Sequence, residues 1–168
     1  MAIPNSTLIE ALREAADRIS AGARYEWGHL ARCNCGHLVQ SLTRMTDVQI
    51  SQAVDHQLDE WTEHAKAFCP NSGRSVDDLF LTLEKSGMSR KDVIHLENLT
   101  DPRVLSRIGA NVRLRKNQRE DVVLYMNAFA DLLEEESGIA PSPTATRRPV
   151  VERTFLDVSI SLPTLSRR

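Results

Sequence analysis

The 168-residue sequence lacks several features that would point directly to a function. It contains 7 glycines and no glycine-rich phosphate loop, which argues against a nucleotide or dinucleotide site. Neither a G-x-S-x-G motif nor an H-E-x-x-H motif occurs, so the local signatures of a serine hydrolase and of a zinc metalloprotease are both missing. These absences leave the common catalytic classes without support from a motif.

Long hydrophobic runs are also absent. No stretch approaches the roughly 20 apolar residues that a membrane-spanning helix requires. The first 19 residues have no basic n-region, and Glu10, Glu14 and Asp17 occupy the place of the apolar core of a signal peptide. We therefore expect a cytoplasmic protein that does not contact a membrane.

Cysteine is scarce, with only Cys33, Cys35 and Cys69 in the chain. An odd and small number of cysteines without an export signal argues against a disulfide framework. The net charge of -2 provides no overall basic field, so nucleic acid is not expected as a partner. Hydrophobic residues at 41% and charged residues at 26% are close to the average of globular proteins. The composition indicates one globular domain, and it does not predict the oligomeric state.

Helix signals dominate the first 138 residues. Capping-box spacing occurs at Thr7 and Glu10, at Thr46 and Gln49, and at Ser89 and Asp92. An N-cap aspartate followed by proline is found at Asp101-Pro102. The clearest helical stripe starts near Asn117 or Gln118 and consists of Val122, Met126, Phe129, Ala130 and Leu133. The sequence therefore predicts an all-α fold, a small bundle of about five to seven helices, with Trp27 and Trp61 as core anchors.

The composition changes after Gly138. Residues 139–168 contain four prolines, many serines and threonines, and a slight excess of basic residues. Residues 155–162 alternate weakly in the manner of a strand. We predict two parts: a helical domain over 1–138, and a tail over 139–168 that is flexible or docks on a protein partner.

One short segment carries most of the chemically capable side chains. His29, Cys33, Cys35 and His37 lie within nine residues, and His64 and Cys69 follow downstream. Zinc is held by thiolate and imidazole donors that converge on one ion. The leading prediction is a structural zinc site built from Cys33, Cys35 and Cys69 with His37, His29 or His64. Three cysteines and one histidine also fit an iron–sulfur cluster by count.

Two other interpretations of the same cysteines remain open. Free cysteine is often buried and packs as a small hydrophobic residue. Alternatively, Cys35 lies near a predicted helix start at Gly36, where the helix dipole favours a thiolate. Cys35 would then be the nucleophile of a thiol enzyme or redox protein, with Cys33 as its resolving partner or His64 as its base.

A third hypothesis concerns the basic stretch 103–119. It contains six cations and no acidic residue: Arg103, Arg107, Arg113, Arg115, Lys116 and Arg119. Such a stretch could make a regulatory interaction module that contacts phosphates or an acidic protein. The aromatic side chains that stack on single-stranded nucleic acid are absent from it. A solvated connection between two helices is the preferred interpretation.

Overall fold

The computed structural model describes residues 2–29, 31–55, 76–109 and 112–138. Within these ranges all of the regular secondary structure is α-helical, and the number of helices falls in the predicted range. The helices are α1 (Ser6–Ser20), α2 (Asn34–Thr43), α3 (Asp47–Asp55), α5 (Val76–Lys85), α6 (Arg90–Asn98), α7 (Pro102–Ile108) and α8 (Arg119–Ser137). The prediction of an all-α fold is confirmed. The predicted tail over 139–168 and the predicted core anchor Trp61 lie outside the described residues.

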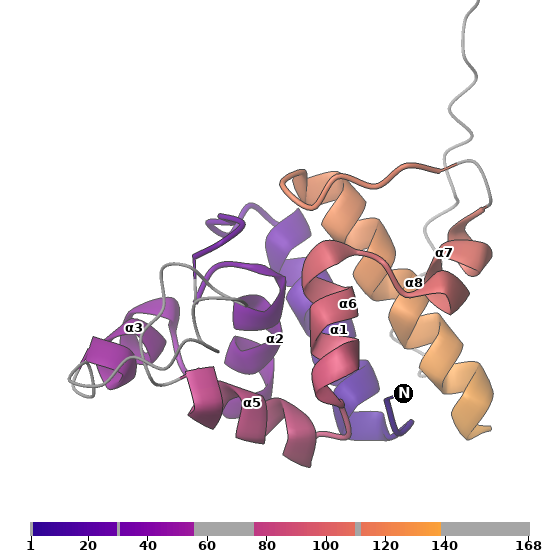
Figure 1. The fold of residues 1–168 in the computed structure, drawn as a ribbon. Helices are drawn as coiled ribbons and strands as arrows, with labels where there is room; N and C mark the ends of the chain where they lie inside the picture. Colours follow the sequence, from indigo (N-terminus) through magenta and orange to yellow (C-terminus); the bar gives the residue numbers. More distant parts are fainter. Residues whose placement is uncertain (1, 30, 56–75, 110–111, 139–168) are drawn as a thin grey trace, which may run out of the picture.

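Two antiparallel helices, α1 and α8, form the centre of the molecule (Figure 1). A hydrogen bond of 2.9 Å from Arg119 Nη1 to the carbonyl oxygen of Ile19 joins the end of α1 to the start of α8. The stripe predicted along α8 is buried, and it meets a buried stripe of α1 made of Leu8, Leu12, Ala15, Ala16 and Ile19. Each large apolar side chain buried in this way stabilises the fold by about 1.5–3 kcal/mol.

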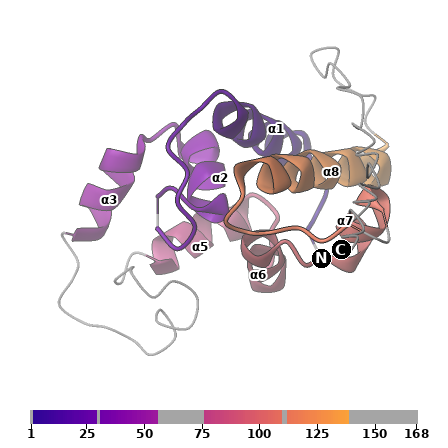
Figure 2. The same cartoon turned by 90° about the horizontal axis from the view of Figure 1, so that it is seen from above.

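The other helices pack on this pair or on one another. Helix α2 packs on α1, α5 and α6 pack on α2, and α7 packs on α8. Helix α3 contacts α2 and lies at the opposite end of the molecule from α7, as the view from above shows (Figure 2). This arrangement places the start of α2, which carries the predicted cluster, beside the end of α6.

Most helix ends follow the predicted capping signals because caps depend on neighbouring residues. Ser89 and Asp92 form a reciprocal capping box, and the Asp101 side chain accepts the N–H of Arg103 with proline at the first helical position. Helix α1 differs, since it begins at Ser6 and is capped by Asn5 instead of Thr7. The Asn5 amide donates to Ile3 O and to Ser86 O, at 3.0 and 2.9 Å, so the cap position also fixes the N-terminal segment against the α5–α6 turn.

Candidate functional site

The predicted Cys/His segment, from His29 to His37, forms the connection before α2 and the first turn of α2. Cys33 is the N-cap of α2, and its sulfur accepts the backbone N–H of Gly36 at 3.4 Å. Helix α2 therefore begins at Asn34, two residues before the start that Gly36 predicted. An N-cap needs an extended backbone and a side-chain acceptor, and Cys33 meets both requirements with its sulfur.

A carboxylate from another helix completes the start of α2. The backbone N–H of Cys35 donates to Glu97 Oε2 at 3.1 Å, and the thiols of Cys33 and Cys35 also hydrogen-bond to this carboxylate. Burial raises the pKa of Glu97, while the hydrogen bonds from Cys35 and Cys33 oppose this rise. A carboxylate is favourable at a helix N-terminus because of the exposed N–H groups and the helix dipole. Glu97 therefore acts as a second cap for α2, contributed by α6.

A neutral polar network lies next to Glu97. The fully buried Asn34 amide donates to the carbonyl oxygens of Leu96 and Glu97, at 3.0 and 3.1 Å. The Tyr25 hydroxyl lies between Asn34 Oδ1, at 2.7 Å, and the carbonyl oxygen of Lys116. Burial raises the pKa of Tyr25, so its hydroxyl stays protonated and can donate. This network satisfies the last carbonyl groups of α6 and joins them to the start of α2.

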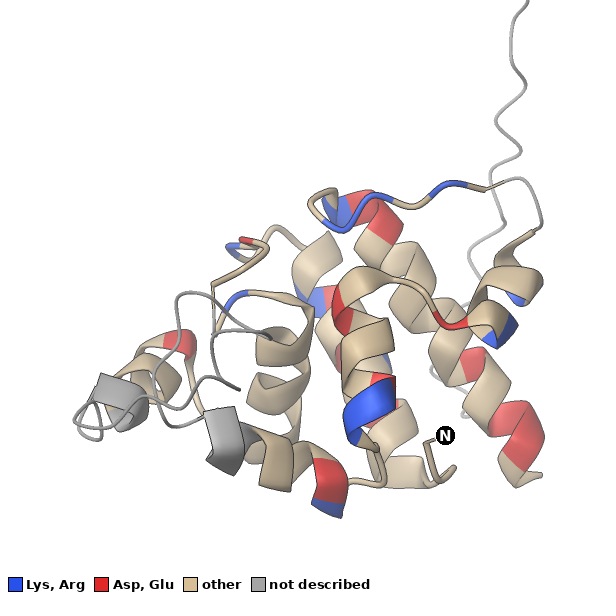
Figure 3. Ribbon diagram, in the orientation of Figure 1, with Lys and Arg blue, Asp and Glu red and all other residues tan. Residues whose placement is uncertain are grey.

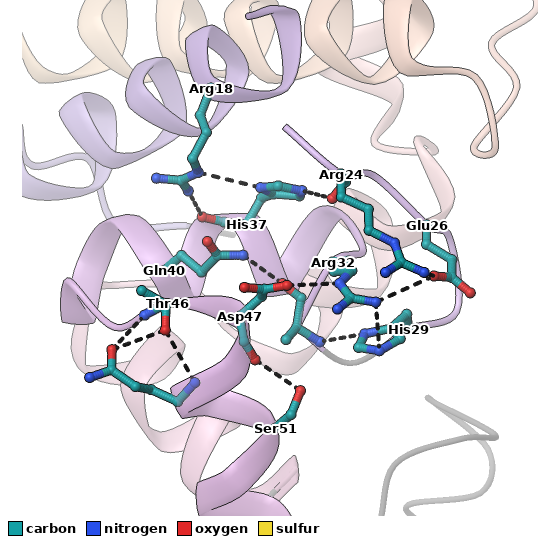
Figure 4. Close-up of polar contacts among 12 residues, drawn as sticks. Arg18, Arg24, Glu26, His29, Arg32, His37, Gln40, Thr46, Asp47 and Ser51 are labelled. Atoms are coloured by element: carbon teal, nitrogen blue, oxygen red, sulfur yellow. Dashed lines mark hydrogen bonds and ion pairs between the residues drawn. The ribbon is translucent and has the colours of Figure 1, made fainter. Parts of the chain in front are cut away.

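His37 is buried between α1 and α2 (Figure 4). Its Nε2 donates to the carbonyl oxygen of Arg24 at 3.2 Å, and its Nδ1 accepts from Arg18 Nε at 3.4 Å. Because the carbonyl oxygen can only accept, Nε2 carries the proton and the imidazole is neutral. Burial, reinforced by the nearby Arg18 guanidinium, lowers the pKa of His37 to about 4. Both ring nitrogens are thus used inside the protein.

His29 lies on the other side of this segment, in a charged group. Its Nδ1 accepts the backbone N–H of Ala31 at 3.3 Å, and its Nε2 lies 3.5 Å from Arg32 Nη1. Arg32 Nε donates to Asp47 Oδ2 at 2.8 Å, and Arg32 Nη1 lies 3.8 Å from Glu26 Oε2 (Figure 4). His29 therefore borders an ion-pair group that connects the start of α3 to the segment before α2.

The prediction of a metal-binding function is wrong. In the part of the chain that the structure describes, no three His, Cys, Asp or Glu side chains are arranged to hold a metal ion. The physical reason is that each predicted donor already has hydrogen-bond partners inside the protein: Gly36 and Glu97 for Cys33, Val93 and Glu97 for Cys35, Arg18 and Arg24 for His37, and Ala31 for His29. Cys69 and His64, the remaining predicted ligands of zinc or an iron–sulfur cluster, lie outside the described residues.

The thiol-enzyme alternative is contradicted as well. Cys33 and Cys35 form no disulfide, and both thiols hydrogen-bond to Glu97. The Cys35 thiol also donates to the carbonyl oxygen of Val93 at 3.7 Å. Both thiols are therefore engaged as hydrogen-bond donors inside the protein. The contacts of Cys33 and Cys35 therefore support capping and packing.

Five of the six cations in the basic stretch 103–119, which the third hypothesis offers to a partner, contact other residues of the chain. Arg103 pairs with Glu136 at 2.9 Å, and Arg107 pairs with Glu135 at 2.5 Å. These pairs place the cations of α7 opposite the acidic end of α8 (Figure 3). Other cations of the stretch serve the connection to α8: Arg115 pairs with Asp121, Arg119 donates to Ile19, and Lys116 contacts Asn98 and the Trp27 ring.

The prediction that Trp27 is a core anchor is wrong, because 41% of this residue is exposed. Its Nε1 donates to the carbonyl oxygen of Glu97 at 3.3 Å, and the Lys116 ammonium lies 3.9 Å from its ring centroid. Sequence reasoning also missed Glu97 and Arg18. Glu97 lies 62 residues from Cys35, so no local pattern could have connected the two.

Comparison with known proteins does not identify a family for this chain. No protein-family model matches the chain, and neither curated proteins nor solved structures match it. Among the described helices, none combines the length and the apolar character needed to cross a membrane. Function must therefore be argued from the geometry and the sequence of this chain.

Proposed function

We propose that the chain is a protein-interaction module, in which the helical domain carries residues 139–168 and this segment binds a protein partner. One observation carries the proposal. Leu156, Val158, Ile160 and Leu162 alternate with Asp157, Ser159 and Ser161. In an extended segment this period of two puts the four apolar side chains on one face. It is typical of a peptide that adds a strand to the sheet edge of another protein.

The way α8 ends supports this proposal. Gly138, with φ +64°, closes the helix in the left-handed conformation that favours glycine. The last turns of α8 are held to α1 by the Arg13–Glu134 pair, at 2.6 Å, and to α7 by the Arg103–Glu136 pair. The segment 139–168 thus starts from a helix that is firmly packed.

Charge indicates the kind of partner. Residues 139–168 contain five arginines and two acidic residues. An acidic border around the receiving sheet edge would attract this segment and speed its association. We propose a partner with an open sheet edge flanked by carboxylates. We also place the module in the cytoplasm, where Cys33 stays reduced and can serve as a cap; in fractionated source cells it should be recovered with the cytosol.

Photo-crosslinking of the full chain in its source cells tests the proposal. We would replace Phe155 with a photoreactive phenylalanine analogue and identify the cross-linked products by mass spectrometry. The expected product is a complex with a second, different protein. Ile160→Asp should abolish this complex because it puts a charge on the apolar face.

Ser159→Asp is the matched control, since it adds the same charge to the polar face and should leave the cross-link in place. Cross-links confined to the chain itself or to a second copy would contradict the proposal. So would equal cross-linking of the Ile160→Asp and Ser159→Asp variants.

A further inference from the structure

Among the described elements, helix α3 packs mainly on α2. It lies at one edge of the fold in both views and contacts α2 (Figures 1 and 2). Ile50 is 2% exposed and belongs to the same apolar core as Leu38 and Val39 of α2. Val48, two residues before it, is 55% exposed. Ile50 is therefore the side chain that anchors the first turns of α3.

In the connection between α2 and α3, the end of α2 and the start of α3 are capped by separate hydrogen bonds. Arg44 closes α2 with φ +62° and ψ +12°, and its N–H donates to the carbonyl oxygen of Gln40 at 2.9 Å. Two residues later, Thr46 and Gln49 cap the start of α3 reciprocally, at 2.9 and 3.2 Å. A change of backbone dihedrals at Arg44 and Met45 would therefore break no hydrogen bond inside α3.

An ion pair fastens the first turn of α3. Arg32 Nε donates to Asp47 Oδ2 at 2.8 Å, with 18% of the Arg32 side chain and 32% of the Asp47 side chain exposed (Figure 4). The Arg32 guanidinium holds the pKa of Asp47 below its usual value. Arg32 lies just before α2, and Asp47 is the first residue of α3. Their contact therefore spans α2 and its connection to α3. It is a stronger contact than the 3.8 Å approach of Arg32 to Glu26.

We propose that α3 is an arm that opens about Arg44 and loosens once it is released, with the Arg32–Asp47 ion pair as its latch and Ile50 as its anchor. The described helix has nine residues, and isolated helices of that length are marginal in water. Release from α2 would therefore also loosen the helix itself. Such partial openings occur without global unfolding. This device is independent of the interaction proposed for residues 139–168.

Hydrogen-exchange mass spectrometry on the full chain at one pH tests the latch. Backbone amides of residues 48–55 should exchange faster than those of α1 and α8. Asp47→Asn removes the latch from the α3 side, and Arg32→Gln removes it without altering the α3 sequence. Both variants should speed exchange in α3 about two- to fivefold, as expected for a partly exposed ion pair, and should leave α1 and α8 unchanged.

Glu135→Gln is the matched control because it breaks a comparable arginine pair, with Arg107, at the other end of the molecule. It should leave exchange in α3 unchanged. Two results would overturn the proposal: exchange in α3 as slow as in α8, or variants at Arg32 and Asp47 that speed exchange equally in all helices. An effect of Asp47→Asn without one of Arg32→Gln would also overturn it, because this would indicate a loss of helix propensity alone.

Discussion

Single residues in the candidate site are explained by hydrogen bonding. Cys33 and Asn34 are buried at the start of α2, where backbone N–H groups need acceptors. Among the described residues, no buried side-chain nitrogen or oxygen lacks a hydrogen-bond partner. Polar groups that are buried without partners are costly, so each of these side chains contributes by satisfying another group. Residue types that suggest chemistry thus serve here as caps and bridges.

His37 leads to a prediction about pH. Its pKa is about 4 in the folded protein, against 6.5 for an unperturbed histidine. Between these values the unfolded chain binds a proton that the folded chain excludes, so stability falls as the pH falls from 6.5 towards 4. The full loss amounts to about 3 kcal/mol. Urea unfolding of the wild type and of His37→Gln, at pH 7 and pH 5, measures the contribution.

The expected result is a smaller loss of stability between pH 7 and pH 5 in His37→Gln than in the wild type. His95→Gln is the control, because His95 is half-buried and contacts Thr100 near the surface. If His37→Gln keeps the wild-type difference between pH 7 and pH 5, His37 is not the neutral, buried group described here.

The contribution of an ion pair between helices to stability depends on how deeply the pair is buried. Arg13 of α1 contacts Glu134 of α8 at 2.6 Å, with 20% and 12% of the two side chains exposed. Arg107 of α7 contacts Glu135 of α8 at 2.5 Å, with 32% and 62% exposed. Water screens the second pair more than the first, so similar distances do not mean similar energies. The first pair is the one that fixes α1 against α8.

Replacing Arg13 with methionine tests this difference between elements. The variant keeps most of the packing but leaves the partly buried Glu134 carboxylate without its Arg13 partner, which should cost about 1–2 kcal/mol. Arg107→Met should cost at most about 0.5 kcal/mol, since it removes an exposed pair. Chemical denaturation of both variants gives the comparison. Equal losses would show that burial does not decide the strength of these two pairs.

The whole molecule is organised around the α1–α8 pair. The end of α8 is also joined to α7 through Arg103 and Arg107, and α2 links the pair to α5 and α6. All core side chains of the described part lie between Ala2 and Leu133. We propose that this core folds without residues 139–168.

A chain that ends at Gly138 tests the division into two parts. It should unfold in urea at the same midpoint and with the same cooperativity as the full chain, because the described core is retained. A shortened chain that loses more than about 1 kcal/mol would indicate that residues 139–168 belong to the folded domain. The same comparison shows whether the tail variants used for cross-linking alter the helical domain.

The sequence by itself determined the all-α class, the stripe of α8 from Val122 to Leu133, and the caps at Thr46, Ser89 and Asp101. Helix periodicity and caps depend on residues within about four positions, so a local pattern contains the necessary information. The cap at Asn5 was missed although it is local, since its side chain accepts the N–H of Leu8. Thr7 and Glu10 have capping-box spacing two residues later, and the local pattern did not distinguish the two starts.

Only the tertiary structure decided the roles of Cys33, Cys35, His29 and His37. Their spacing was compatible with a metal site, a reactive thiol or simple packing, and the local pattern could not choose among these. These roles are determined by residues that are distant in the sequence. Glu97 of α6 hydrogen-bonds to the two thiols, and Arg18 of α1 hydrogen-bonds to His37. Such partners are brought together by helix packing, which the order of residues in a short segment does not contain.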